Sequence, residues 1–256
     1  ERQARGRTGP PQQGMTFRDY LIEQVTLVEA ELVRLVPSSE TPPETLHRAM
    51  RYSLFAGGKR IRPRLVLLTA EALGFSGPER FELAATVEFI HTATLFHDDV
   101  IDHAETRRGK VSANRVWGNA ASVLVGDFLY SKSFKLMIDD GSMAILKLIS
   151  TTTNTMSEGE VFQLMKAGDV NITEKEYLSI VEKKTSILIS AACAIGGITL
   201  DNLDAVLVAG VLDVDLLFGL SEVRAVRGQF QHSRREEEER GLRQEPEGHH
   251  HQGALW

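Results

Sequence analysis

Three carboxylates lie within five positions of the stretch HDDVID, residues 97–102. Carboxylates this close repel one another, so each favours its protonated form unless a cation lies among them. On a helix Asp98 and Asp102 share one face, whereas Asp99 is offset by about 100°. Two such carboxylates predict a Mg²⁺ site, because Mg²⁺ completes its shell with water and phosphate oxygens. The apolar surroundings and the pair Arg107–Arg108 that follows favour this site over a solvated acidic helix face.

A second group of cations lies upstream in GGKRIRPR, residues 57–64. Glycines let the backbone approach a ligand closely, and Lys59 and Arg62 then offer a point charge and a bidentate fork to phosphate oxygens. His91 lies seven residues before Asp98, two helical turns away and nearly on the same face. A magnesium–diphosphate substrate would satisfy both the acidic and the basic groups.

Helical periodicity dominates the sequence that must position these groups. Apolar residues recur at spacings of three and four after Thr16, a predicted N-cap, and proline entries and glycine ends mark further boundaries. No strand alternation or internal repeat is found, so the sequence predicts an all-α single domain. The predicted helices cover residues 17–36, 42–58, 64–74, 78–104, 112–139, 143–168 and 173–199.

Composition restricts the class of protein. The 256 residues suffice for one large domain, and a formal charge of −6 argues against a general nucleic-acid binder. The single cysteine, Cys193, cannot form an internal disulfide, which fits a reducing compartment. The longest apolar run, Ser186–Ile198, is shorter than the roughly 20 residues of a membrane span. We expect a cytoplasmic protein without a membrane span and without a nucleic-acid partner.

Three segments differ in character. Residues 1–14 are rich in Arg, Gln, Gly and Pro, which predicts a disordered leader. Residues 15–200 form the predicted helical domain. Residues 201–256 begin with an apolar stretch that has no clear helical face and continue with a highly charged run, which predicts an atypical, partly disordered C-terminal segment.

Several motifs occur in a specific order: GGKRIRP, EFIHTATLFHDDVIDHAETRRGK, GDFLYSKSF, GEVFQL and EKKTSIL. In order and spacing they resemble the trans-polyprenyl diphosphate synthases, from about Met15 to Thr199. The resemblance implies an isoprenoid-synthase helical bundle around a central cavity, with C-terminal helices that are incomplete or altered here. It implies a Mg²⁺-dependent, homodimeric prenyltransferase that condenses isopentenyl diphosphate with an allylic prenyl diphosphate.

The resemblance also implies roles for residues at matching positions, beginning with the allylic substrate. Asp98 and Asp102 are expected to hold Mg²⁺ ions that bridge its diphosphate, with Asp99 in support. Arg107 is expected to clamp the same diphosphate. Gln163, in GEVFQ, is expected to be a polar group near the metal ions.

Two further groups of residues match the family. Lys184 and Thr185 resemble the pair that steadies the allylic end and the developing cation. No histidine base is required, because the released diphosphate can take the proton. The residues that resemble the isopentenyl diphosphate site are Lys59, Arg62, His91 and Arg108.

Product length is the next expectation. Ala93 and Thr94 lie one turn before the aspartates, where aromatic residues restrict products to short chains in this family. Both residues are small, so the resemblance implies a medium- or long-chain product, with geranylgeranyl as the minimum.

The sequence departs from the family after Thr199. The second aspartate-rich motif, expected about 40 residues beyond the Lys-Thr pair, is not found: Asp213 and Asp215 come too early, and basic residues follow Phe230–Gln231. Three explanations stay open. The C-terminal part is truncated or read out of frame, with impaired activity; the chain is a non-catalytic, prenyl-diphosphate-binding subunit of a heteromeric synthase; or it is a terpene cyclase. The GGKRIRP cluster argues against a cyclase, which needs no second diphosphate.

Overall fold

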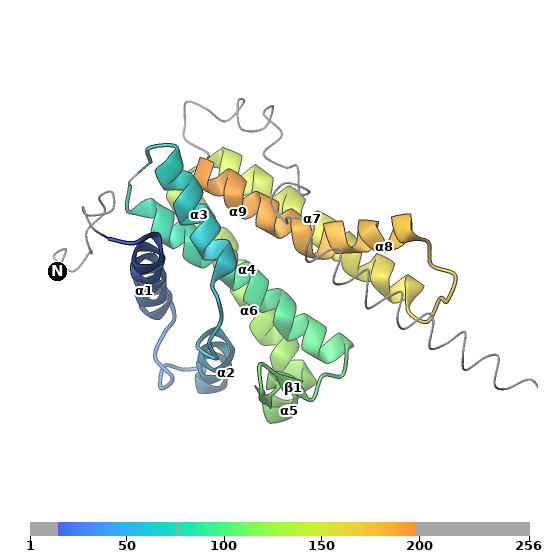
Figure 1. The fold of residues 1–256 in the computed structure, drawn as a ribbon. Helices are drawn as coiled ribbons and strands as arrows, with labels where there is room; N and C mark the ends of the chain where they lie inside the picture. Colours follow the sequence, from blue (N-terminus) through green and yellow to red (C-terminus); the bar gives the residue numbers. More distant parts are fainter. Residues whose placement is uncertain (1–14, 76, 198–256) are drawn as a thin grey trace, which may run out of the picture. The chain divides into compact units, whose positions relative to one another are not determined.

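The computed structural model describes residues 15–75 and 77–197, all of which belong to one compact unit, Glu1–Val211. This part is helical apart from one short hairpin, so the all-α prediction is confirmed (Figure 1). None of its helices combines the length and the apolar character of a membrane span. The elements are α1 (Phe17–Leu35), α2 (Glu44–Leu54), α3 (Ile61–Ala72), α4 (Glu79–Ile101), β1 (Thr106–Arg107), β2 (Lys110–Val111), α5 (Ala113–Trp117), α6 (Asn119–Asp140), α7 (Met143–Lys166), α8 (Glu174–Val181), the π-helical turn η1 (Glu182–Ser186) and α9 (Ile187–Gly197).

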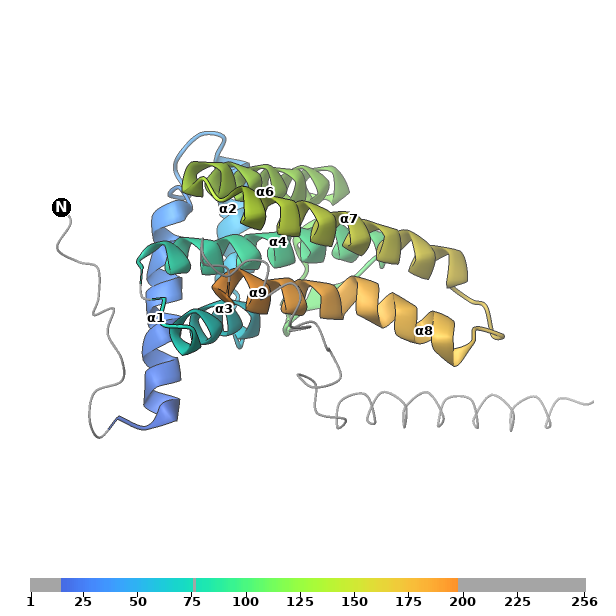
Figure 2. The same cartoon turned by 90° about the horizontal axis from the view of Figure 1, so that it is seen from above.

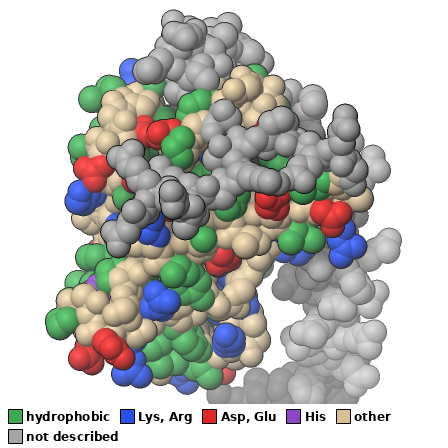
Figure 3. Space-filling view, turned by 90° about the vertical axis from the view of Figure 1, so that its left-hand side faces the viewer, with side chains coloured by type: hydrophobic (Ala, Val, Ile, Leu, Met, Phe, Trp, Pro, Cys, Tyr) green, Lys and Arg blue, Asp and Glu red, His purple; other side chains and the backbone are tan. Residues whose placement is uncertain are grey.

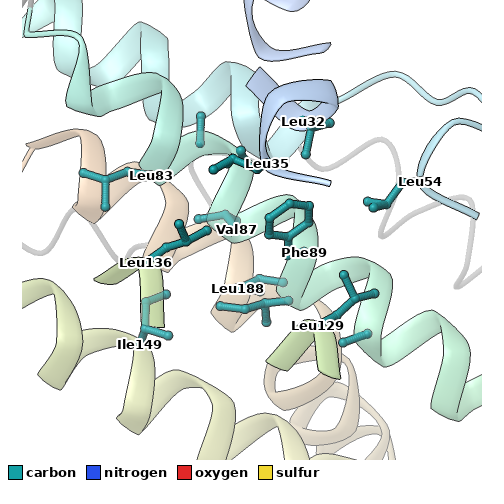
Figure 4. Close-up of a cluster of buried hydrophobic side chains, with 14 of the residues drawn as sticks. Leu32, Leu35, Leu54, Leu83, Val87, Phe89, Leu129, Leu136, Ile149 and Leu188 are labelled. Atoms are coloured by element: carbon teal, nitrogen blue, oxygen red, sulfur yellow. The ribbon is translucent and has the colours of Figure 1, made fainter. Parts of the chain in front are cut away.

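Helix α4 lies at the centre of the core. It packs against α6, α3, α1 and α9, and every residue from 83 to 90 is buried. Figure 4 shows Val87 and Phe89 of α4 among leucines from the surrounding helices. In Figure 2, α1 crosses the direction of α4, whereas α7 runs along the line formed by α8 and α9. The C-terminal end of α4, which carries residues 97–102, is therefore held in place by the packing of α4 against α6, α3, α1 and α9.

The structure corrects several predicted boundaries. Helix α3 begins at Ile61 rather than at residue 64, and Pro63 is tolerated there because first-turn N–H groups have no helical partner. The predicted helix 112–139 is broken at Gly118, whose φ of +86° favours glycine. The sequence did not predict β1–β2, a two-residue antiparallel pair joined through Arg108 and Gly109, which leaves the all-α class unchanged.

The surface of this unit mixes charge types. On the face shown in Figure 3, acidic and basic side chains alternate with apolar ones, and no large patch of one sign is visible. The predicted leader and the atypical C-terminal segment lie outside the described residues. Their expected disorder stays a prediction.

Candidate active site

The stretch HDDVID, residues 97–102, is called the acidic motif below; it occupies the last turn of α4 and its C-cap. Asp99 is buried, Asp98 is half-buried and Asp102 is exposed. Asp102 is the C-cap residue with near-helical φ of −82°, and its N–H donates to the Asp98 carbonyl oxygen at 2.8 Å. The two carboxylates predicted to share a face thus stand one turn apart, at the point where α4 ends.

Asp98 lies in an acidic environment that extends beyond its own helix. Burial, and then the charge of Glu160 on α7, raise the pKa of Asp98 to about 6; Lys184 opposes this shift. Burial, and then the charges of Asp98 and Glu160, raise the pKa of Tyr130 on α6 to about 12. The cluster formed by Asp98, Asp102 and Glu160, with Tyr130 beside it, is called the acidic cluster below.

The π-helical turn η1 brings Lys184 to this cluster. The Lys184 Nζ lies 2.8 Å from Glu160 Oε2. Gly159 makes the approach possible, because a Cβ there would lie 2.7 Å from the Cβ of Lys183 and 3.2 Å from its carbonyl carbon. A π-helical turn is unusual and frequently marks a functional site. Thr185, next in η1, is exposed.

Gln163 and Glu160 lie on the same helix, three positions apart. Gln163 is half-buried on α7, one turn beyond Glu160. The family resemblance implied a role for Gln163 but none for Glu160, although both belong to the motif GEVFQL. A carboxylate next to a glycine inside a matched motif was the signal that could have found it.

The β1–β2 hairpin carries the two arginines that follow the acidic motif. The Arg107 Nε donates to Asp99 Oδ1 at 2.8 Å, and its Nη2 also donates to this oxygen. Arg108, with a φ of +52°, donates from Nη1 to the Gly57 carbonyl oxygen. The Tyr52 hydroxyl donates to the Val111 carbonyl oxygen at 2.8 Å and ties the hairpin to α2. The acidic motif and the glycine-rich loop are therefore joined through neighbouring arginines.

The upstream cations converge with the hairpin. Burial lowers the pKa of Arg62. The negative charge of Glu88 opposes this shift, and the positive charge of Arg108 adds to it. Burial, and then the charges of Arg62, Arg108, Arg107 and Arg60, lower the pKa of His91 to about 3, so this imidazole is neutral near pH 7. Arg62, His91 and Arg108 are called the basic cluster below.

The basic cluster has unused donor capacity. The buried Arg62 Nε has no hydrogen-bond partner within residues 15–75 and 77–197, and an unpaired buried donor is costly unless a ligand binds it. Lys59 is exposed in the loop whose Gly57 carbonyl binds Arg108. An anion is the ligand that this arrangement fits.

The acidic cluster suits a hard divalent cation. Its carboxylates raise the pKa of Asp98 together with burial, and a bound cation would remove this penalty. In the described part of the chain, no group of three or more acidic, His or Cys side chains could hold a metal ion alone. Mg²⁺ binds through one or two carboxylates and takes substrate phosphate oxygens for the rest of its shell, so Asp98 and Asp102 are the residues that could hold it.

The raised pKa of Asp98 predicts a pH-dependent cost to stability. Because the carboxyl binds its proton more tightly in the folded than in the unfolded chain, its favourable contribution is present below about pH 4 and lost as the pH rises through about 6. In metal-free buffer at pH 7.5, Asp98→Asn is expected to raise the free energy of unfolding by about 1 kcal/mol, a value discounted for partial exposure. Urea unfolding at pH 4 and pH 7.5 tests this; a variant less stable than wild type at pH 7.5 would contradict it.

The motifs and the geometry agree with comparisons to known proteins. A family model described as polyprenyl synthetase matches residues 43–212. Octaprenyl diphosphate synthase of Escherichia coli is 49% identical over 147 residues, which cover 57% of this chain and 46% of that protein. Geranylgeranyl diphosphate synthase of Methanosarcina mazei is 38% identical over 189 residues, which cover 72% of this chain and 58% of that protein. The chain spans about half the length of the curated relatives it matches.

Solved structures show the same fold. A decaprenyl diphosphate synthase from Rhodobacter capsulatus has a TM-score of 0.66 at 41% identity, covering 73% of this chain and 58% of that one. A polyprenyl synthase from Caulobacter crescentus, complexed with calcium and isoprenyl diphosphate, has a TM-score of 0.67 at 37% identity, covering 79% and 62%. The predicted isoprenoid-synthase fold is confirmed. Because the family match spans well over half of its residues, this chain belongs to the polyprenyl synthetase family.

Proposed function

We propose that this chain forms the diphosphate-binding part of a trans-polyprenyl diphosphate synthase, which condenses isopentenyl diphosphate with an allylic prenyl diphosphate. The observation that carries the proposal is the meeting of two charge clusters at one end of α4. Arg107 pairs with Asp99 and acts on the pKa of both Asp98 and His91, so it stands between the acidic and the basic cluster. Two diphosphates need this combination, one bound through a metal and one bound by cations directly.

The acidic cluster is proposed to bind the allylic diphosphate. Asp98 and Asp102 would hold Mg²⁺, and Asp99 orients Arg107 by pairing with it. Mg²⁺ supplies charge neutralisation that makes diphosphate a better leaving group. Arg107 and Lys184 donate to the same diphosphate oxygens, and their attraction strengthens as negative charge develops on the leaving group.

Several side chains would assist the allylic site. Glu160 holds Lys184 in place within 2.8 Å. Gln163, half-buried on α7, would supply a polar side chain near the residues that hold the metal. Thr185 is proposed to face the developing cation with its hydroxyl oxygen, whose lone pairs favour positive charge.

The basic cluster is proposed to bind isopentenyl diphosphate. Arg62 offers its unpaired Nε, and Arg108 and Lys59 add positive charge beside it. His91 is neutral without a ligand, and so it acts as a hydrogen-bond donor rather than as a cation. The double bond of the bound substrate attacks the allylic carbon as its C–O bond to diphosphate breaks. The released diphosphate then accepts the proton lost from the new chain, which leaves a longer allylic diphosphate.

The remaining expectations belong to this proposal. Residues 15–200 would form the synthase-like domain, and the protein would work as a cytoplasmic homodimer. Support for a dimer comes from exposed apolar side chains on α5 and α6, among them Val116, Val123 and Leu124. Burying such side chains in an interface is favourable, since exposed apolar area is costly.

One assay separates the two open functions. Purified protein is incubated with isopentenyl diphosphate, farnesyl diphosphate and Mg²⁺, and diphosphate release and product length are measured. We expect release of diphosphate and a product longer than farnesyl, both abolished by EDTA. Binding of isopentenyl diphosphate without turnover would support a non-catalytic subunit of a heteromeric synthase. Light scattering on the same sample tests the homodimer.

Product length is proposed to depend on Ala93. This residue is fully buried on α4, one turn before Asp98. A phenyl ring at this position would block a chain that grows along α4, so Ala93→Phe is expected to shorten the product distribution, measured by chromatography of the dephosphorylated alcohols. Because added core volume commonly costs about 1–3 kcal/mol, the fraction of folded protein is measured by circular dichroism. An unchanged product length in folded Ala93→Phe would contradict the prediction; Ala93→Val is the small-volume control.

A further inference from the structure

In the sequence, Arg60 lies between Lys59 and Arg62, which are both proposed to bind diphosphate. The guanidinium of Arg60 itself is buried inside the protein. Its side chain is 1% exposed. Its backbone is left-handed, with φ +50° and ψ +41°, and it is the N-cap residue of α3. The two glycines before Lys59 also have positive φ values, +89° and +156°. Glycines adopt this region readily but an arginine does not, so the surroundings must hold Arg60 in place.

Three elements hold the guanidinium of Arg60. Its Nε donates to Glu29 Oε1 of α1 at 2.5 Å, and its Nη1 donates to Glu88 Oε1 of α4 at 2.6 Å. Its Nη2 donates to the Leu54 carbonyl oxygen at the end of α2, also at 2.5 Å. Two of these bonds join opposite charges, which are the stronger kind. The Glu29–Arg60–Glu88 network therefore ties Arg60, the last residue of the loop formed by residues 57–60, to α1 and α4, and the bond to Leu54 ties it to α2.

The Glu29–Arg60–Glu88 network also acts on the basic cluster through Glu88. Glu88 lies three residues before His91 on α4, and its negative charge raises the pKa of Arg62 against the effect of burial. Gly58 lies so close to Arg108 that a Cβ there would stand 2.9 Å from Arg108 Nη1. A change in the loop conformation would therefore move the loop relative to both α4 and the hairpin.

We propose that Arg60 is a positioning residue for isopentenyl diphosphate: the Glu29–Arg60–Glu88 network holds residues 57–60 in the conformation from which Lys59 and Arg62 reach the diphosphate. The inference rests on the proposed function of the basic cluster. Arg60 itself contacts no ligand in this scheme. The alternative is a buried ion network that only stabilises the fold.

The test begins with Arg60→Met, which keeps an unbranched apolar stem and removes the guanidinium donors. We expect the Kd for isopentenyl diphosphate, measured by calorimetry, to rise about tenfold or more, since small misplacements of binding groups have large effects. Amide hydrogen exchange of a peptide covering residues 55–62 is expected to accelerate. Val66→Ala, a buried change on α3 away from the loop, is the matched control: it lowers stability and leaves the Kd unchanged.

A double variant separates positioning from stability. Arg60→Met leaves Glu88 buried without its cation, which is destabilising; Arg60→Met/Glu88→Leu removes both partners and is expected to recover the unfolding midpoint. Positioning predicts that the raised Kd and the fast exchange persist in the double variant. The double variant loses one positive and one negative charge, so the net charge near the site is unchanged and a persistent weakening cannot come from net charge.

Two results would overturn the proposal. In the first, the double variant recovers wild-type Kd together with stability, which assigns Arg60 a purely structural role. In the second, Arg60→Met shows wild-type exchange in residues 55–62. A wild-type chain that binds no isopentenyl diphosphate would instead overturn the proposed function, and the exchange measurement would still decide whether Arg60 fixes the loop.

Discussion

Asp98→Asn is expected to lower kcat for prenyl transfer by about a thousandfold, equivalent to roughly 4 kcal/mol of lost transition-state stabilisation. The amide keeps the size of the side chain but removes the negative charge that Mg²⁺ requires. The KM for isopentenyl diphosphate should change much less, because the basic cluster contains Arg62, His91 and Arg108 and not Asp98. Steady-state kinetics with both substrates varied, at saturating Mg²⁺, measures the split.

Asp127→Asn is the matched control for this prediction. Asp127 is an exposed aspartate on α6, 3.3 Å from His97, the histidine that precedes Asp98. It should retain wild-type kcat. Equal losses in the two variants, or full activity in Asp98→Asn, would contradict the proposed metal site. Asp98→Asn is also expected to be more stable than wild type at pH 7.5. Misfolding therefore cannot explain a loss of activity in this variant.

Arg107→Ala is expected to destabilise the fold. Asp99 is 5% exposed, and the substitution leaves its carboxylate buried without its cation. Breaking a wholly buried pair costs about 3–5 kcal/mol; since Arg107 is 36% exposed, we expect about 2 kcal/mol here. Urea unfolding measures this loss, and the variant should also bind the allylic diphosphate more weakly.

A partner substitution checks the cause of the Arg107 effect. Asp99→Asn should restore much of the stability in the double variant Arg107→Ala/Asp99→Asn, because no unpaired charge is then buried. Arg115→Ala, which removes an exposed pair with Glu105 at 3.4 Å, should change stability by less than about 0.5 kcal/mol. If Arg107→Ala were as mild as Arg115→Ala, the Asp99 pair would not support the hairpin.

The sequence predicted the helices because their signals are local. Thr16 accepts from the Asp19 N–H as the predicted N-cap, and α4 and α7 begin within one residue of their predicted starts. The break at Gly118, the hairpin and the π-helical turn were missed. Two-residue strands are too short for alternation, and the π-helical turn depends on how closely Gly159 lets α7 approach.

Most residues of the site were predictable from the sequence, but the ion pairs between them were not. The motifs named every residue of the two clusters except Glu160, because a resemblance compares positions in the chain. The partners Glu29, Glu88 and Glu160 were missed, since each contacts a residue more than 20 positions away and no local pattern reports such a contact. The second aspartate-rich motif would fall in residues 201–256, outside the described residues.

The β1–β2 hairpin has a consequence for how the two substrates bind. Arg107 and Arg108 are adjacent, and one is directed to the acidic motif while the other is directed to the glycine-rich loop. Two ligands that each immobilise one of these arginines would order the same few peptide bonds. The first ligand to bind then bears the entropic cost of ordering these peptide bonds. The second ligand binds more tightly because this cost has already been met. Synergy between the substrates would thus arise from shared backbone, without contact between the ligands themselves.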